Sequence, residues 1–91
     1  MVRPRICRKI RFRAKANYFK PQGVPMRHLD EVILSKEEME AIKLKDFDGW
    51  EQTEAAEKMK TSQSTFQRIL SSARAKIAEA IVKGKALKIE E

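Results

Sequence analysis

A run of polar side chains between residues 62 and 71 has the types and the spacing of a surface that reads DNA. Glutamine can pair with adenine through two hydrogen bonds, arginine can pair with guanine in the same way, and serine can bond to a base edge or to a phosphate. In a helix, these positions would lie on the exposed side of the first turns, and no acidic residue stands among them. The candidate base-reading residues are Gln63, Ser64, Gln67, Arg68 and Ser71.

Phosphate contacts are expected from the start of the same helix and from basic side chains elsewhere in the chain. The first backbone N–H groups of a helix attract a phosphate. Residues 1–29 hold nine Lys or Arg and no acid, which favours an arm that lies along phosphates, although a solvated tail has the same composition. The candidate phosphate-binding residues are Ser62, Arg74, Lys76, Arg3, Arg5, Arg11 and Arg13.

Residues suited to catalysis or metal binding are scarce. The single histidine, His28, and the single cysteine, Cys7, do not stand at a metal-ligand spacing. The glutamates of residues 37–40 recur at helical spacing, so we interpret them as a solvent face rather than as a paired acid and base. Trp50 could stack on a base, but an aromatic that leads into a helix is more often a core anchor. We therefore expect no enzymatic activity, no metal and no cofactor.

Length and composition favour one small, folded domain. A chain of 91 residues with 42% hydrophobic and 36% charged residues is too apolar for a wholly disordered tail and too charged for a membrane protein. No apolar run approaches the roughly 18 residues that span a bilayer. A single cysteine cannot form an internal disulfide, which fits a reducing compartment. We expect a cytoplasmic protein that does not associate with a membrane.

The charge is divided unevenly along the chain, although its sum is a formal +7. Residues 1–29 carry +9, residues 30–60 carry −5 and residues 61–91 carry +3. A chain adjusted only for solubility would intersperse the two signs. The separation therefore favours a polyanionic partner, with the acidic middle segment facing away from it.

Three helices are expected to position the candidate residues. Ser35 and Glu38 have the spacing of a capping box, which predicts a helix start that Asp46 to Gly49 then ends. The second helix is predicted over about residues 52–59, and the third from its cap at Ser62 to about Lys83. The apolar stripe predicted for the third helix consists of Phe66, Ile69, Leu70, Ala73, Ile77, Ala80 and Ile81.

The join between the second and third helices has the spacing of a helix-turn-helix. Ala56 supplies a small side chain where the two backbones approach, and Met59 is placed to close the core. Lys60 stands in the turn, where a glycine is common because the backbone there is left-handed. A plain three-helix bundle would show the same amphipathic spacing, but it would require neither the short turn nor the basic arm.

Two short strands are expected at the ends of the chain. Apolar and polar residues alternate from Ile10 to Tyr18, with Phe19 breaking the pattern, and again at Leu87 and Ile89. Because a lone strand leaves its backbone groups unpaired, we expect these two segments to pair. The predicted fold class is mainly α: a three-helix helix-turn-helix domain with a basic N-terminal arm and short β pairing of the termini. The corresponding division is an arm over residues 1–29, a helix-turn-helix domain over 30–84 and a strand or tail over 85–91.

The motifs also resemble those of known families. The run from Leu34-Ser35-x-x-Glu38 through Glu54-Ala55-Ala56 to Ala73-Arg74-x-Lys76 is similar to region 4 of the primary sigma factors, which recognises promoter DNA. With Arg3-Pro4-Arg5, the loop Gly23-Val24-Pro25-Met26 and the run from Gly84 to Glu90, nearly the whole chain resembles the small prokaryotic family called domain of unknown function 134. That resemblance implies a DNA-binding fold without an assigned target. Glu51 departs from the family pattern where a serine usually caps the second helix, and Gln67 departs where a glycine is common.

These observations lead to one principal hypothesis and two alternatives. We expect a sequence-specific, double-stranded DNA-binding transcription regulator that inserts the start of its third helix into the major groove. Single units of this kind usually act in pairs, so we expect a homodimer on half-sites about one helical turn apart. Ile77, Ile81 and Val82 are candidates for the dimer contact, and packing of the same residues within one copy is an equal alternative. The first alternative is a module that docks on the transcription machinery, such as RNA polymerase, through its acidic middle segment. The second is an RNA-binding protein, which charge alone favours.

Overall fold

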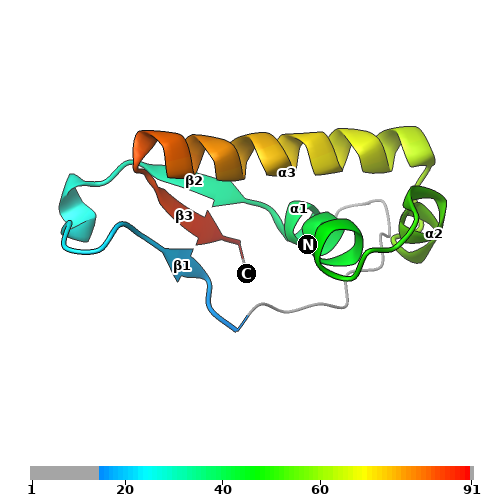
Figure 1. Cartoon of the computed structure of the whole chain (residues 1–91), viewed down its shortest axis with the longest axis horizontal. Helices are drawn as coiled ribbons and strands as arrows, with labels where there is room; N and C mark the ends of the chain where they lie inside the picture. The colour runs from blue at the N-terminus through cyan, green and yellow to red at the C-terminus, as the bar shows by residue number, and fades with distance from the viewer. Residues whose placement is uncertain (1–14, 91) are drawn as a thin grey trace, which may run out of the picture.

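The computed structural model describes residues 15–90, which form three helices and a three-stranded sheet (Figure 1). The helices are α1 (Lys36–Ile42), α2 (Gln52–Lys58) and α3 (Gln63–Lys83), and the strands are β1 (Tyr18–Phe19), β2 (Glu31–Leu34) and β3 (Ala86–Ile89). A 3-10 turn, η1 (Met26–His28), precedes β2, and a π-helical segment, η2 (Lys43–Phe47), extends α1. The long α3 runs along one edge of the molecule, with α1 and α2 beside its first half and the sheet beside its second half. The predicted mainly α fold is confirmed.

The helix starts follow the local capping signals. The Ser35 side chain accepts from the Glu38 backbone N–H at 3.1 Å, and the Glu38 carboxylate accepts from the Ser35 backbone N–H at 2.8 Å, so the predicted capping box is formed. Ser62 caps α3 by accepting from the Thr65 backbone N–H at 3.1 Å. Glu51 occupies the N-cap of α2 without a side-chain capping bond. Ser35 and Ser62 form a side-chain capping bond and Glu51 does not, because serine holds its side-chain oxygen closer to the backbone than glutamate does.

The short connection between α2 and α3 confirms the predicted helix-turn-helix. Lys60 has a φ of 57°, so its backbone is left-handed, and its N–H donates to the Glu57 carbonyl at 2.9 Å. The Thr61 N–H donates to the Ala56 carbonyl at 2.9 Å. These bonds satisfy two of the last carbonyls of α2, and the chain passes from α2 into α3 through only four residues.

Two apolar clusters hold α3 in place. The first joins all three helices, and Trp50 packs against it as the predicted core anchor; its buried members are Ala41, Leu44, Ala55, Ala56, Met59, Phe66 and Leu70. The second joins α3 to the sheet, and its buried members are Leu34, Ala73 and Ile89. Because α3 contributes to both clusters, its first turns are fixed relative to α1 and α2, and its last turns are fixed relative to the sheet.

The sheet confirms the predicted pairing of the two outer segments and adds a strand. Its order is β1-β3-β2, with β1 antiparallel and β2 parallel to β3. Tyr18 pairs with Lys88, and Phe19 pairs with Leu87. The predicted strand over residues 10–18 is wrong for residues 15–17, and Phe19 belongs to β1; residues 10–14 lie outside the described part. β2 was not predicted, although Val32 and Leu34 are buried and alternate with exposed neighbours.

Burial corrects two further predictions. Ile81 is 76% exposed and so does not belong to the buried stripe of α3. Glu38 and Glu40 are buried, so the glutamates of residues 37–40 are not a solvent face; α1 turns these two carboxylates inward against its neighbours. Met59 packs in the core as predicted. Within residues 15–90, no helix is long and apolar enough to cross a membrane.

Candidate nucleic-acid interface

The start of α3 presents all five candidate base-reading residues at the surface. Ser64, Arg68 and Ser71 recur at four and three residues, so they form one ridge opposite the buried Phe66 and Leu70. Gln63 and Gln67 are also exposed and lie beside this ridge. The structure therefore brings the five side chains together on the outer side of the first three turns of α3.

Hydrogen bonds within this region orient some of these groups. The Gln67 side-chain amide donates to the Ser71 hydroxyl at 3.1 Å, which aligns both groups along the helix. The Gln52 side-chain amide lies 3.5 Å from the Gln63 carbonyl, joining the beginning of α2 to the beginning of α3. The Ser62 hydroxyl donates to the Thr65 hydroxyl at 2.9 Å while it caps the helix. Its first role is therefore to fix the helix start, from which the backbone N–H groups project.

Arg74, a candidate phosphate ligand, is held by a carboxylate of the same chain. Its Nε donates to Asp46 Oδ2 at 3.1 Å and its terminal nitrogen to Asp46 Oδ1 at 2.6 Å. These bonds lower the pKa of Asp46 and raise the pKa of Arg74. This two-point pairing fixes the guanidinium against η2, one turn beyond the candidate base-reading residues.

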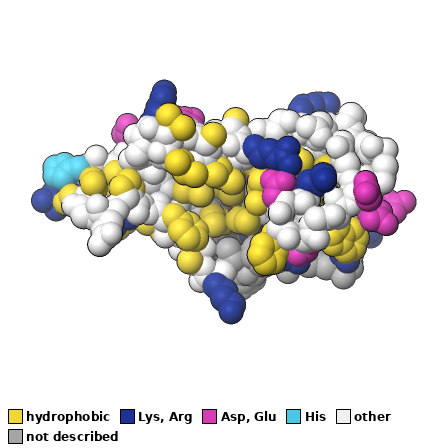
Figure 2. Space-filling view, viewed as in Figure 1, with side chains coloured by type: hydrophobic (Ala, Val, Ile, Leu, Met, Phe, Trp, Pro, Cys, Tyr) yellow, Lys and Arg dark blue, Asp and Glu magenta, His cyan; other side chains and the backbone are white. Residues whose placement is uncertain are grey.

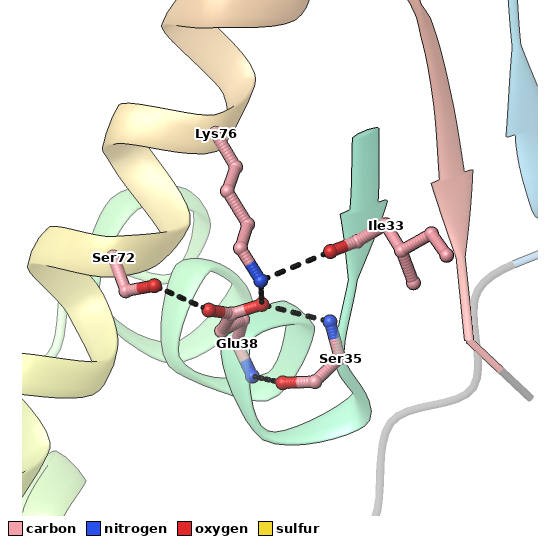
Figure 3. A network of polar contacts seen from close by, with 5 residues as sticks. All are labelled: Ile33, Ser35, Glu38, Ser72 and Lys76. Carbon is pink, nitrogen blue, oxygen red and sulfur yellow. Dashed lines mark hydrogen bonds and ion pairs between the residues drawn. The ribbon is translucent and has the colours of Figure 1, made fainter. Parts of the chain in front are cut away.

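Lys76, the other candidate on α3, belongs to a network centred on Glu38 (Figure 3). Its Nζ donates to Glu38 Oε1 at 2.9 Å and to the Ile33 carbonyl at 3.0 Å, while the Ser72 hydroxyl donates to Glu38 Oε2 at 2.6 Å. Burial raises the pKa of Glu38, but the hydrogen bonds from Ser72, the Ser35 backbone and Lys76 outweigh it, so that pKa lies below its ordinary value. The network joins α1, β2 and α3 on the flank of α3 opposite the Arg74–Asp46 pair.

Sequence reasoning did not find this second role of Glu38. The capping box identified the bond from the Ser35 backbone to Glu38 Oε1, but Oε1 also accepts from Lys76, 38 residues away, and Oε2 accepts from Ser72, 34 residues away. A local motif carries no signal for such distant partners. The spacing of Ser72 and Lys76, one helical turn apart, shows only that they share a side of α3.

Arg68 also borders a hollow between α1 and α3. This hollow has a volume of about 320 Å³ and is lined by Ser35, Glu37, Glu38, Thr65, Arg68, Ile69 and Ser72. It separates the base-reading ridge from the N-terminus of α1. The Arg68 side chain is exposed and forms no ion pair within residues 15–90. Its guanidinium is therefore available to an external acceptor.

The surface of α2 has the opposite character. Glu51, Glu54 and Glu57 are exposed, and Lys58 lies over the Trp50 ring with its Nζ 4.5 Å from the ring centroid. Figure 2 shows acidic side chains at the end of the molecule where α2 lies. These carboxylates would therefore repel a polyanion from α2, whereas the exposed start of α3, which carries no acidic side chain, would not.

Arg3, Arg5, Arg11 and Arg13 of the basic arm lie outside the described residues. Within residues 15–90, no group of three or more His, Cys, Asp or Glu is placed to hold a metal ion.

Comparison with known proteins identifies the family. A family profile described as "Protein of unknown function DUF134" matches residues 1–91. The chain is 57% identical over 90 residues to a UPF0251 protein of Thermoanaerobacter pseudethanolicus, covering 99% of this chain and 76% of that protein. It is 54% identical to one from Dehalococcoides mccartyi, covering 99% and 77% of the two chains, and 53% identical to one from Moorella thermoacetica, covering 99% and 60%. No solved structure matches the chain. The chain thus belongs to the family described as protein of unknown function DUF134.

Proposed function

We propose that this protein binds double-stranded DNA in a sequence-specific manner and regulates transcription in the cytoplasm. The observation that carries the proposal is the exposed polar ridge at the start of α3, which follows a four-residue turn and holds Ser64, Arg68 and Ser71. A major groove about 12 Å wide admits one helix presented in this way. Arg68 would bind guanine, and Gln67 would bind adenine or hold Ser71 towards a phosphate.

The backbone contacts would come from three sources. The N-terminus of the 21-residue α3 offers backbone N–H groups to a phosphate. The arginines of the arm, Arg3, Arg5, Arg11 and Arg13, would neutralise further phosphates along the duplex. Arg74 and Lys76 would contribute less than their charge suggests, because Asp46 and Glu38 already pair with them.

The exposed carboxylates of α2 would set the orientation of the duplex. Repulsion by Glu51, Glu54 and Glu57 disfavours a duplex that crosses α2, so the DNA would follow α3 and the basic arm. Charges of this kind influence orientation and association rate more than affinity.

The same carboxylates support a second candidate function. A module that docks on a basic surface of RNA polymerase through α2 would use Glu51, Glu54 and Glu57 without reading DNA. The burial of Glu38 and Glu40 removes two carboxylates from the acidic surface that the sequence suggested. The docking surface would therefore consist of α2 alone, and we place this function second.

Selection of bound duplexes from a random pool, followed by a salt titration on the selected site, tests the proposal. A protein that contacts about six phosphates loses affinity on the order of 1000-fold between 50 and 200 mM salt. Enrichment of one motif together with that salt dependence would support major-groove reading. An unenriched pool with weak, salt-independent retention would contradict it and leave the docking function.

A further inference from the structure

One broad face of the molecule carries a concentration of apolar side chains that neither cluster fully buries. Figure 2 shows hydrophobic side chains gathered over the strands and below α3. Phe19 and Val32 both pair in register with Leu87, so the three side chains share one face of the sheet. Leu87 and Ile77 pack against the same buried cluster, so this sheet face continues onto α3.

The apolar face continues along one flank of α3. Ile81 follows Ile77 by one turn and is 76% exposed. Arg74, Ala78 and Ile81 recur at four and three residues and so form one stripe, which lies on the flank where Asp46 binds Arg74. Phe47, the residue after Asp46, is 81% exposed. We call the surface formed by Phe19, Phe47, Ile77, Ala78, Ile81 and Leu87 the apolar flank.

We infer that the apolar flank is the contact between two copies of this chain, related by a twofold axis that passes beside Ala78. The inference rests on the proposed function, because that function fixes how the two α3 helices must be arranged. The axis would run parallel to the direction in which the side chains of the ridge project from α3. Both proposed base-reading ridges then face the same duplex, and the two α3 helices lie antiparallel beside each other.

The length of α3 supports this position of the axis. Gln67 lies eleven residues before Ala78, so the Gln67 residues of two antiparallel copies lie about 33 Å apart along the helix axes at ~1.5 Å per residue. With helix axes ~8–10 Å apart, the separation becomes about 34 Å. Successive major-groove half-sites on one face of B-DNA are ~34–36 Å apart. The small side chain of Ala78 allows the close approach that the axis requires.

The exposed apolar area is also sufficient for a small specific interface. Phe19 is 51% exposed, Ile81 76% and Phe47 81%, which leaves on the order of 400 Å² of apolar surface per copy if a whole aromatic side chain contributes ~150–250 Å². Interfaces are about 56–65% apolar, so this corresponds to roughly 600–700 Å² per copy. Stable specific interfaces begin at about 600 Å² per partner.

Sedimentation equilibrium without DNA tests the interface independently of DNA binding. We expect the wild type to sediment as a dimer and Ile81→Asp as a monomer, because the carboxylate would be buried without a partner. Lys83→Asp is the matched control, since residue 83 lies on the same stripe as Ser72 and Lys76, on the opposite flank of α3. Ile81 is largely exposed within one copy, so Ile81→Asp should melt at the temperature that the wild type shows when it is diluted below its dimer dissociation constant. A wild type that is monomeric throughout would overturn the inference.

Cysteine cross-linking locates the axis. In a chain that carries Cys7→Ser, Ala78→Cys should form an intermolecular disulfide on oxidation, because the residue 78 side chains of the two copies face each other across the twofold axis. Lys83→Cys in the same background should not, because the two side chains would lie on outer flanks. Equal cross-linking of both variants, or of neither, would overturn this arrangement.

Duplex binding separates this inference from the proposed function. On a selected duplex with two half-sites, Ile81→Asp should bind on the order of 100-fold more weakly than Lys83→Asp, since linked half-sites bind cooperatively. A protein that dimerises through Ala78 but selects no DNA would uphold the interface and contradict the function. A monomer that selects a single half-site would uphold the function and contradict the interface.

Discussion

Lys76 and Glu38, 38 residues apart in sequence, form an ion pair of 2.9 Å that ties the middle of α3 to the start of α1. The same ammonium group donates to the Ile33 carbonyl on β2, an edge strand of the sheet. Because α3 also carries the proposed base-reading ridge, this network sets where that ridge lies relative to α1 and to the sheet. The proposed function therefore depends on a contact that is remote from the base-reading side chains.

Glu38→Gln is expected to lower the free energy of unfolding by about 1–3 kcal/mol at neutral pH, because hydrogen bonds to a buried charged group are weakened. Since the pKa of Glu38 is lowered in the folded state, its stabilisation is complete above its ordinary value of 4.5 and is lost as the pH falls below that value. Urea unfolding from pH 7 to pH 3 checks this. The difference between wild type and Glu38→Gln should shrink in acid, and a difference that grew would contradict the role of the carboxylate.

Ile89→Ala is expected to lower stability by roughly 2–4 kcal/mol, because Ile89 is 7% exposed on the central strand and packs with Leu34 and Ala73. Lys88→Ala, on the opposite face of the same strand, should change stability by less than about 0.5 kcal/mol. Chemical denaturation of the two variants provides the comparison. Similar losses for both would mean that β3 is not packed as described.

Lys60→Gly is expected to raise stability by roughly 0.5–1 kcal/mol. Lys60 has a φ of 57°, a left-handed conformation that costs a residue with a side chain ~1–2 kcal/mol, and glycine gains back only part of this because its unfolded chain is more flexible. Lys58→Gly, in the last turn of α2, should instead destabilise the protein by about 1 kcal/mol or more, because it loses helix propensity and the contact of Lys58 with the Trp50 ring. If both substitutions destabilised the protein, strain at Lys60 would not be a property of the turn.

Arg74→Ala should weaken binding to every duplex by less than about threefold, because its guanidinium is already paired with Asp46. The same change should cost no more than about 1 kcal/mol of stability, since both side chains of the pair are partly exposed. Fluorescence anisotropy with selected and shuffled duplexes checks the binding. A loss of tenfold or more would show that Arg74 leaves Asp46 to bind a phosphate.

The helices could be predicted from the sequence because their signals are local. Ser35 and Ser62 stand at helix starts, and the residues after them repeat at three and four positions, which determines both the boundaries and the buried side. The left-handed turn at Lys60 followed from the spacing between α2 and α3. The pairing of β1 with β3 was predicted only because an isolated strand is unfavourable.

The remaining features depend on contacts between distant segments. β2 is a four-residue strand, too short for its alternation to stand out from the proline- and glycine-containing loop before it. To predict the burial of Glu38, one would need to know that Ser72 and Lys76 lie opposite α1. To predict the pairing of Arg74, one would need to know the position of Asp46, 28 residues away. Periodicity alone also placed Ile81 in the core, although α3 extends past the helices that could cover it.

The most direct test of the central claim is the ratio of affinities for a selected duplex and for a shuffled duplex of equal length, measured for the wild type and for Arg68→Ala at one salt concentration. If α3 reads bases, Arg68→Ala should reduce that ratio by about 1–3 kcal/mol, or roughly 5- to 150-fold, while binding to the shuffled duplex changes little. An unchanged ratio with equal weakening on both duplexes would mean that Arg68 contacts only phosphates, and it would contradict the assignment of the ridge as the base-reading surface.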